Sequence, residues 1–238
     1  MATSDPTLPD AWREWCDMTC ERLRDDGLLR SLRTVTPIEG SSASALVDSA
    51  THTEWTASAP STGNLPQDSG ELQHELAMFA TNDYLGMSVH PEVRAAAATA
   101  AAAHGCGPRS SALVCGYTAS HRSLEASLAN LKHKQECLLF PTGYAANMAV
   151  LGALADSDRC AIFSDELNHA SIIDGARLAM RAGASLHIYR HNDLEHLDAL
   201  LRESGAVRKL IISDSLFSMD GDYAVCTSLC VRPHCARP

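Results

Sequence analysis

The stretch CAIFSDELNHASIIDGARLAMRAGASLHIYRHNDLEHLDALLRESGAVRKLIIS, residues 160–213, predicts the fold. Short apolar runs at 160–164, 186–190 and 209–213 alternate with two longer segments of helical periodicity. Strands separated by helices make right-handed crossovers, which give a parallel sheet with helices on both faces. The predicted fold class is therefore α/β.

The same alternation extends toward the N-terminus. ECLLF (136–140) predicts a further strand, and residues 141–155 a turn into a helix. Pro91 and Gly105 mark the start and end of another helix, and Thr118 or Ser120 caps the next one. The chain from about residue 91 onward is thus predicted as regular structure.

The first 74 residues have a different composition. Residues 10–33 place apolar side chains on one helical stripe, which Gly27 interrupts. Residues 40–70 are rich in Ser, Thr, Ala, Gly and Pro, and no Lys or Arg occurs between Thr34 and Val93. We therefore expect a flexible surface insertion in this part of the chain.

The bulk composition narrows the class of protein. The chain has 238 residues, 45% hydrophobic and 20% charged, as in ordinary globular proteins. A net charge of −10 argues against nucleic acid or an anionic membrane as the main partner, while backbone N–H groups can still hold an anionic small molecule. We find no apolar run of the roughly 20 residues that span a bilayer and no secretory signal, and the nine cysteines are scattered. These features predict a cytoplasmic protein with reduced thiols.

In a parallel α/β sheet the ligand site lies beyond the carboxyl ends of the strands. That rule selects four places in the sequence: 142–144, 165–171, 190–192 and 213–222. Gly143 allows a ligand to approach the backbone, and the N–H groups of a helix start suit a phosphate. From this stretch alone, a glycine that serves only a tight turn is the favoured interpretation.

Two further features are ambiguous when each is taken alone. His169, at a helix start beyond a strand end, either stacks on an aromatic ligand or moves a proton, or else it only caps its helix. Near the end of the chain stand four potential metal ligands: Cys226, Cys230, His234 and Cys235. Their spacing matches no common zinc module, so we favour a chance cluster and predict no metal site.

Seven segments together resemble one family, the α-oxoamine synthases. These are enzymes dependent on pyridoxal 5′-phosphate (PLP) with the aspartate-aminotransferase fold (fold type I), and the resemblance is strongest to the plant-type 8-amino-7-oxononanoate synthases of biotin biosynthesis. The segments run in family order between about residues 28 and 224. They are LLRSLR, FATNDYLGMSVHPEV, GPRSSALVCGYTASHRSLE, LLFPTGYAANMAV, IFSDELNHASIIDG, YRHND and DSLFSMDGD.

The resemblance implies an acyltransferase and assigns roles to individual residues. The family reaction condenses L-alanine with pimeloyl-CoA, with loss of carbon dioxide, on a homodimeric enzyme that uses PLP. Gly143 and Tyr144 would hold PLP, and His169 would stack on its ring and help to position the substrate. By the same resemblance, Ser218 would lie near the phenolic oxygen of the ring, Arg30 would contact substrate, and Asn82 would reach the site across a dimer interface.

The sequence departs from the family after Ala224. The family continues to a strand ending Asp-x-Ala-His-Gly and to a Ser-Lys pair, and neither occurs here. The Schiff-base lysine is therefore absent, and Lys132, Lys134 and Lys209 lie away from the predicted site. We expect this chain to be truncated, inactive and poorly stable alone, with 136–140 separated from the other strands and 209–213 left as an apolar sheet edge.

The sequence thus predicts four segments: a helical segment 1–39, the flexible insertion 40–74, a partial PLP-binding domain 75–224 and an unrelated disordered tail 225–238. Three alternatives stay open: a non-catalytic short isoform that pairs with full-length subunits, an α-oxoamine synthase for another amino acid or acyl-CoA, and a plain phosphate-binding module, which the run of motifs disfavours. A peroxisomal location is the alternative for a full-length form.

Overall fold

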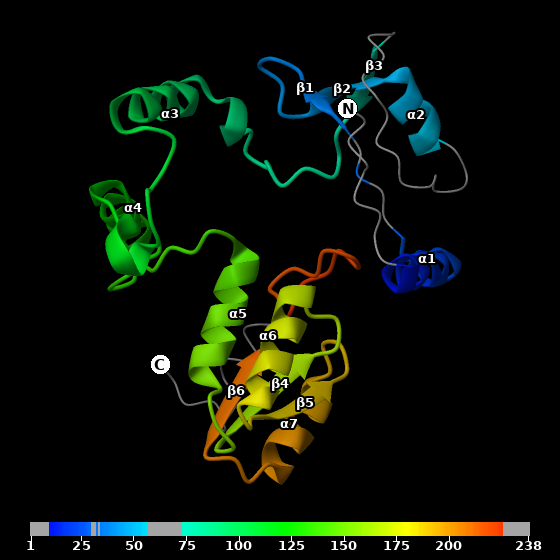
Figure 1. Ribbon diagram of the computed structural model, residues 1–238. Coiled ribbons are helices and arrows are strands. Elements are labelled where there is room, and N and C mark those ends of the chain that lie inside the picture. Colours follow the sequence, from blue (N-terminus) through cyan, green and yellow to red (C-terminus); the bar gives the residue numbers. More distant parts are fainter. Residues whose placement is uncertain (1–9, 30–31, 33, 57–72, 226–238) are drawn as a thin grey trace. The chain divides into compact units, whose positions relative to one another are not determined.

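The computed structural model describes residues 10–29, 32, 34–56 and 73–225 (Figure 1). The chain divides into two units, Met1–Gly107 and Pro108–Pro238, and each is described by itself.

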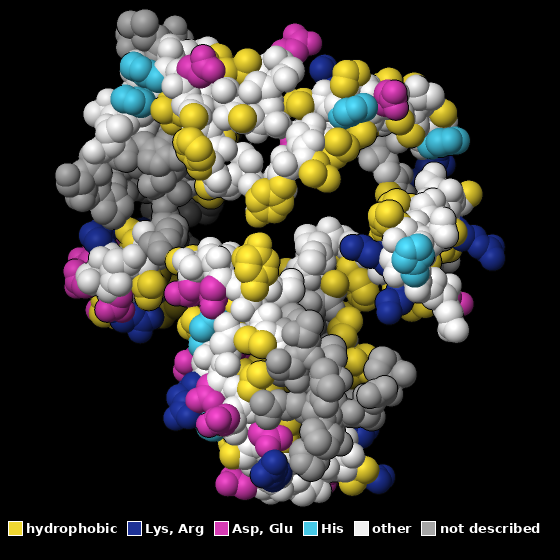
Figure 2. Space-filling model, turned by 180° about the vertical axis from the view of Figure 1, so that it is seen from behind, with side chains coloured by type: hydrophobic (Ala, Val, Ile, Leu, Met, Phe, Trp, Pro, Cys, Tyr) yellow, Lys and Arg dark blue, Asp and Glu magenta, His cyan; other side chains and the backbone are white. Residues whose placement is uncertain are grey.

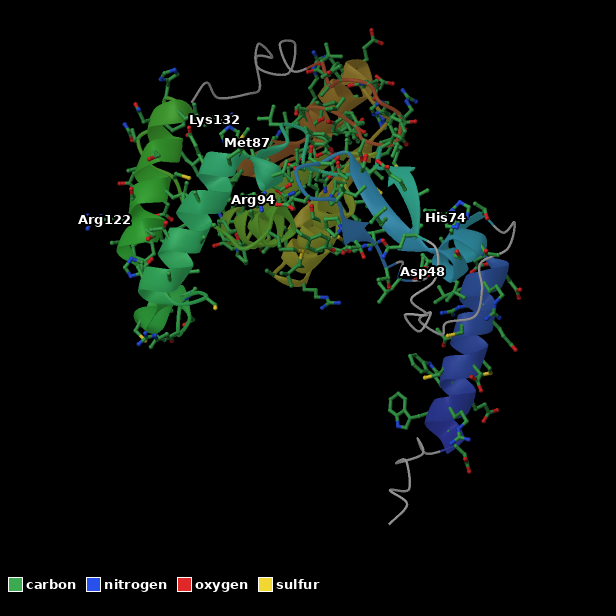
Figure 3. All side chains as sticks on the ribbon, turned by 90° about the horizontal axis from the view of Figure 1, so that it is seen from above. Asp48, His74, Met87, Arg94, Arg122 and Lys132 are labelled. Atoms are coloured by element: carbon green, nitrogen blue, oxygen red, sulfur yellow. The ribbon has the colours of Figure 1, made fainter. Side chains whose placement is uncertain are left out.

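The first unit contains a small antiparallel sheet and several helices. The sheet has the order β1-β2-β3, and His74 of β3 lies opposite Val47, next to Asp48 at the end of β2 (Figure 3). The helix expected from residue 10 ends before Gly27, whose φ of 66° suits glycine. The elements are α1 (Asp10–Asp25), β1 (Thr36–Pro37), β2 (Ser44–Asp48), α2 (Ser49–Thr56), β3 (Gln73–Ala77), η1 (Met87–Val89) and α3 (Pro91–His104).

Strand β2 and helix α2 correct the prediction of a flexible insertion over residues 40–74. Ala45 and Val47 of β2 are buried and alternate with less buried neighbours, and β3 supplies the backbone partners. An alternation of two small apolar residues is too short to stand out from a Ser/Thr-rich composition. The remaining part of that segment, 57–72, lies outside the described residues.

The second unit contains the parallel sheet that residues 160–213 predicted. The sheet has the order β5-β4-β6, with both neighbours parallel to β4. The α/β fold class is therefore confirmed, and Thr118 is the cap of α4. The elements are η2 (Ala112–Gly116), α4 (Ala119–Leu131), α5 (Gly143–Leu154), β4 (Cys160–Asp165), α6 (Ala170–Arg181), β5 (Ser185–Tyr189), α7 (Leu194–Glu203) and β6 (Arg208–Ile212).

Strand β4 is the centre of the core, because its alternate side chains enter two apolar clusters. Cys160 and Ile162 pack with Ala176 and other residues of the α5–α6 side. Phe163 packs on the opposite face with Leu197 and other residues of the α7 side. Every residue of β4 is buried, as expected for a strand covered by helices on both faces.

Residues 136–140 correct the strand prediction, since they form no strand. Leu138 is 70% exposed, and the Leu139 N–H donates to Glu125 Oε1 at 2.9 Å instead of to a neighbouring strand. A strand is defined by ladder hydrogen bonds to a neighbour, so an apolar run without one does not become extended sheet. The expected separation of this segment from the other three strands, and the position of β6 at a sheet edge, are both confirmed.

Apolar side chains are also found on the surface (Figure 2). Phe79, Leu113 and Met219 are each more than 90% exposed. No helix within the described ranges has both the length and the apolar character needed to cross a membrane.

Candidate functional site

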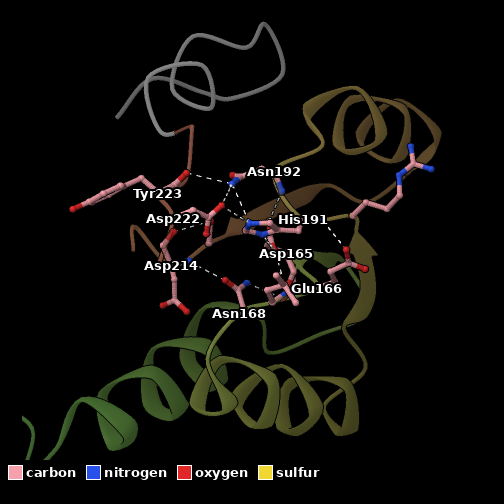
Figure 4. Close-up of polar contacts among 12 residues, drawn as sticks. Asp165, Glu166, Asn168, His191, Asn192, Asp214, Asp222 and Tyr223 are labelled. Atoms are coloured by element: carbon pink, nitrogen blue, oxygen red, sulfur yellow. Dashed lines mark hydrogen bonds and ion pairs between the residues drawn. The ribbon is translucent and has the colours of Figure 1, made fainter. Parts of the chain in front are cut away.

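The loops that follow β4, β5 and β6 meet at the carboxyl end of the parallel sheet (Figure 4). His191, after β5, contacts Asp165 at the end of β4, with 3.0 Å between Nδ1 and Oδ1. The Nε2 atom of His191 lies 2.8 Å from Oδ2 of Asp222, which comes from the turn after β6. The Asn192 N–H donates to the second oxygen of Asp165 at 3.0 Å. Three of the four places predicted from strand ends thus form one polar network.

A second set of hydrogen bonds joins the β4–α6 loop to the start of the segment after β6. The Asn168 side chain donates to the Ile212 carbonyl oxygen at 2.9 Å and accepts from the Asp214 N–H at 2.8 Å. The Asp214 carboxylate in turn accepts from the His169 N–H at 2.8 Å. Asn168 is buried, so these bonds fix the backbone on both sides of the sheet edge.

His169 is the N-cap residue of α6. Its Nδ1 atom accepts from the Ser171 N–H at 3.2 Å and lies 2.7 Å from the Ser171 hydroxyl. Because a backbone N–H can only donate, Nδ1 is the unprotonated nitrogen. The capping interpretation is therefore confirmed, and it leaves the exposed imidazole ring free to contact a ligand as well.

The N-terminus of α5 has two backbone donors to offer. The side-chain oxygen of Thr142 accepts from the Ala145 N–H at 3.0 Å, and its carbonyl oxygen accepts from the Ala146 N–H at 3.1 Å. The first bond satisfies one of the N–H groups that a helix start leaves unpaired, and the second is the first bond within the helix. Among the described residues, the N–H groups of Gly143 and Tyr144 have no acceptor, so they remain for an outside one. A Cβ built on Gly143 would meet no atom within 4 Å, so space lies open in front of the helix.

Helix α5 is held against α6 by close packing and a hydrogen bond. A Cβ on Gly175 would lie 2.7 Å from Leu151 Cδ1, so only glycine permits this approach. The Asn147 side chain donates to the Ser171 hydroxyl at 2.9 Å.

The same helix contact places Tyr144 beside His169. Their ring centroids are 6.3 Å apart, with 76° between the ring planes. The Tyr144 hydroxyl donates to Asp174, and this bond to a carboxylate raises the pKa of Tyr144 above its ordinary value. The two helix starts therefore present a pair of backbone N–H donors close to two aromatic rings.

The predicted site residues divide into three groups. Gly143, Tyr144 and His169 are brought together at the starts of α5 and α6. Ser218 is exposed in the turn between β6 and Asp222, and Asn82 is exposed in the first unit, where its side chain accepts from the Tyr84 hydroxyl. Arg30 lies outside the described residues.

Sequence reasoning missed the residues of the polar network as partners. Asp165, His191, Asn192 and Asp222 all fall in places that the strand-end rule selected, but the sequence does not indicate which side chains contact one another. The signal was their position, directly after strands of one parallel sheet.

The lysines lie as expected, away from these groups. Lys132 follows the carboxyl end of α4 (Figure 3), and Lys134 comes two residues later. Lys209 lies in β6, and its ammonium donates to the Leu201 carbonyl oxygen at 2.5 Å, at the end of α7. Each of the three therefore belongs to a different part of the second unit from the α5 and α6 starts.

The donor set suits a phosphorylated ring better than a metal. Paired backbone N–H groups at a helix start are typical phosphate ligands, and an exposed imidazole can cover the face of a ring. Within the ranges that the structure describes, no group of His, Cys, Asp and Glu has metal-binding geometry. Cys226, Cys230, His234 and Cys235 lie outside those ranges.

The known proteins that are similar to this chain belong to the family that the sequence motifs indicated. Residues 75–230 match the model of the aminotransferase class I and II family. An 8-amino-7-oxononanoate synthase of Arabidopsis thaliana is 51% identical over 164 residues, covering 63% of this chain and 34% of that protein. The synthase of Anaeromyxobacter sp. (strain K) is 44% identical over 211 residues, covering 89% and 46%.

Among solved structures, the serine palmitoyltransferase of Sphingomonas wittichii has a TM-score of 0.60 and 32% identity, covering 63% of this chain and 37% of that chain. The chain spans about a third of the Arabidopsis thaliana synthase and just under half of the Anaeromyxobacter one. The match of the family model to most of the chain, together with these relatives, confirms the resemblance that the motifs indicated. The chain therefore belongs to the aminotransferase class I and II family, and its relatives are α-oxoamine synthases.

Proposed function

We propose that this chain provides the phosphate- and ring-binding part of a PLP site in an 8-amino-7-oxononanoate synthase. The observation that carries the proposal is the open start of α5. There the N–H groups of Gly143 and Tyr144 have no acceptor among the described residues, and the Tyr144 ring lies 6.3 Å from the exposed ring of His169. The N–H groups of Gly143 and Tyr144 would hold the phosphate, with the positive end of the helix dipole favouring its charge. His169 would cover one face of the ring, and Ser218 would contact its phenolic oxygen.

When bound, PLP supplies an electron sink for the carbanion that forms from the amino acid. The protein residues bind and orient the reactants. His169 is fixed by two contacts, its backbone N–H on Asp214 and its Nδ1 on Ser171, so its ring has little freedom to turn away. The reaction that we propose for the whole protein is the decarboxylative condensation of L-alanine with pimeloyl-CoA on a homodimer in the cytoplasm.

Binding of the ligand can be measured without the complication of lysine adducts. Pyridoxine 5′-phosphate keeps the ring and the phosphate of PLP but lacks the aldehyde that reacts with surface lysines. Isothermal titration calorimetry of the full chain should show tighter binding of this compound than of pyridoxine, by about tenfold or more, because charge-assisted hydrogen bonds contribute about 1.5–3 kcal/mol each. Equal affinities for the two compounds would contradict the proposal.

The substitution His169→Asn separates the ring contact from the helix cap. Asparagine is a favoured N-cap residue, so α6 should keep its start and the protein its melting temperature. Loss of the stacking ring should weaken binding of pyridoxine 5′-phosphate by about two- to tenfold and leave the affinity for inorganic phosphate unchanged. A variant that binds both ligands like the wild type would limit His169 to capping.

Catalytic activity is expected to be absent from this chain alone. None of its three lysines lies at the α5 and α6 starts, as described above. A thiol assay should detect no release of CoA from pimeloyl-CoA in the presence of L-alanine and PLP. Turnover of the purified chain above the rate without protein would show that this expectation is wrong.

A further inference from the structure

His191 contacts two segments that are far apart in the sequence, the end of β4 and the turn after β6 (Figure 4). Its two ring nitrogens face the carboxylates of Asp165 and Asp222, at 3.0 Å and 2.8 Å. The ring also meets the buried side chain of Phe217 edge-on, with 4.4 Å between centroids. The His191 side chain is only 20% exposed and that of Asp165 1%, so water screens the first contact weakly.

The geometry sets the protonation state of His191. An ionised carboxylate can only accept a hydrogen bond, and a neutral imidazole has one N–H. A neutral ring would therefore turn a lone pair toward one of the two carboxylates. The Asn192 amide nitrogen also lies 3.1 Å from Nε2, but its two hydrogens have oxygen acceptors in Asp222 Oδ2 and the Tyr223 carbonyl. The contacts are satisfied together when both ring nitrogens carry protons.

The turn after β6 is fastened at both of its ends, and the fastenings differ. At the start, the neutral Asn168 side chain donates to the Ile212 carbonyl oxygen and accepts from the Asp214 backbone N–H. At the end, Asp222 contacts His191 and Asn192 through Oδ2, while its Oδ1 atom is buried without a hydrogen-bond donor among the described residues. At this end of the turn the imidazolium compensates the charge of Asp222, whose side chain is 45% exposed and so is also reached by solvent.

We propose that protonated His191 is a positioning residue, which fastens the turn 213–222 and the Ser218 it carries to the carboxyl end of the sheet. The inference rests on the proposed function, in which Ser218 lies beside the bound ring. Loss of one proton from His191 would replace a donor with a lone pair and release the end of the turn.

The surrounding charges agree with this assignment. The hydrogen bonds to Asp222 and then to Asp165 raise the pKa of His191 above its ordinary value, against the opposing effect of burial. Glu166 adds negative charge, since its carboxylate accepts from the His191 N–H at 2.9 Å. The neighbouring cation, Arg190, is paired with Asp193 at 2.6 Å.

The expected pH dependence follows from the raised pKa. The contribution of His191 to the stability of the turn is fully present below its unfolded pKa of about 6.5. It is lost as the pH rises through the higher folded pKa. The turn should therefore be fastened at mildly acid and neutral pH and loosen in alkaline solution.

Two measurements on the full chain without ligand test the proposal. NMR of protein labelled with ¹⁵N-histidine should show both His191 nitrogens protonated at about pH 6, with a titration midpoint above about 6.5. Hydrogen exchange of the Phe217 and Gly221 amides, which bond within the turn, and of the Ala224 amide, which bonds to Ser215 of the turn, gives protection factors once intrinsic rates are divided out. Protection should fall about tenfold for each pKa unit by which the His191 midpoint exceeds its unfolded value.

Variants identify the group that carries the effect. His191→Gln should lower the protection of the turn and remove its pH dependence, and the milder Asp222→Asn should shift the His191 midpoint downward. His187→Gln is the matched control, because His187 lies in β5, stacks on Phe163 and is comparably buried, and it should keep wild-type behaviour. A neutral His191 tautomer at pH 6, or turn protection that is independent of pH in the wild type, would overturn the proposal.

Ligand affinity separates this inference from the proposed function. If His191 positions Ser218, the affinity for pyridoxine 5′-phosphate should fall with pH along the same midpoint as turn protection, and it should fall in His191→Gln but not in His187→Gln. Turn protection that follows His191 in a chain that binds no pyridoxine 5′-phosphate would support the fastening and contradict the PLP site. Binding of pyridoxine 5′-phosphate by a chain whose turn protection does not depend on His191 would support the PLP site and contradict the fastening.

Discussion

Two apolar stretches of similar composition lead into the candidate site, and they have different structures. CAIFS (160–164) lies in β4, between two parallel neighbours and under helices on both faces. ECLLF (136–140) has no strand neighbour among the described residues and remains irregular, with Leu138 largely exposed. The comparison teaches that an apolar run becomes a strand only where another strand completes its hydrogen bonds.

The difference extends to the two halves of the site. The loops after β4, β5 and β6 are held to one another by hydrogen bonds at the sheet edge. The start of α5 follows ECLLF, which belongs to no sheet within the described ranges, and it depends on the contact of α5 with α6 at Gly175 and Ser171. The first half should therefore respond to changes in the sheet core, and the second to changes between the two helices.

The substitution Phe163→Ala should have the largest effect. Phe163 is completely buried in the α7 cluster, and truncation of such a side chain costs about 3–5 kcal/mol through lost burial and the cavity left behind. Urea unfolding followed by circular dichroism would measure the loss. A loss below about 1 kcal/mol would mean that the sheet core contributes little to stability.

Gly175→Ala should have the next largest effect, by separating the helices. The added methyl would lie 2.7 Å from Leu151 Cδ1, and overpacking of this kind costs about 1–3 kcal/mol. The matched double variant Gly175→Ala/Leu151→Ala removes the clashing atom, so it should be more stable than the sum of the two single changes predicts. Strict additivity in the unfolding free energies would show that the two side chains do not meet.

Ser171→Ala tests the polar contact between the same helices. The hydroxyl accepts from Asn147 and contacts His169 Nδ1, so its removal leaves a partly buried amide without its partner at a cost of about 1 kcal/mol. Thermal unfolding would detect this loss. Asn147→Ala removes the other partner, and a double-mutant cycle that gives no coupling between the two would contradict the contact.

Leu138→Ser should have the smallest effect. The side chain is 70% exposed in a segment without strand partners, so the change in unfolding free energy should stay within about 0.5 kcal/mol. A loss comparable to that of Phe163→Ala would mean that ECLLF is buried in a sheet after all.

The sequence was sufficient for the elements whose partners are close in the chain. Residues 160–213 contain three strands and the two helices that cover them, so their periodicity predicted the sheet and the edge where the site lies. ECLLF was predicted wrongly because its composition suits a strand, whereas strand formation depends on a neighbour that composition does not show. β2 was missed for the opposite reason: it has a strand neighbour, but its composition does not suggest a strand. That neighbour, β3, begins 25 residues after β2 ends, so the local sequence does not reveal the pairing.

The site was predicted as a set of places and not as contacts. Gly143, Tyr144 and His169 were named from their positions at helix starts and from the family resemblance, and they do lie together. The contacts of His191 with Asp165 and Asp222 connect residues that are 57 positions apart in the chain. They depend on side-chain directions that the sequence does not reveal. Both carboxylates looked like ordinary polar residues of loops.

The central claim is that the start of α5 holds a phosphate, and two glycines of the same helix test it most directly. A Cβ on Gly143 meets no atom within 4 Å, and one on Gly152 comes only to 4.0 Å from Leu178 Cδ2, so neither alanine substitution disturbs the fold. Calorimetric titration with pyridoxine 5′-phosphate should give wild-type affinity for Gly152→Ala. For Gly143→Ala it should show a loss of about tenfold or more, because the methyl group keeps the phosphate from the N–H donors. Equal affinities for the two variants would contradict the account.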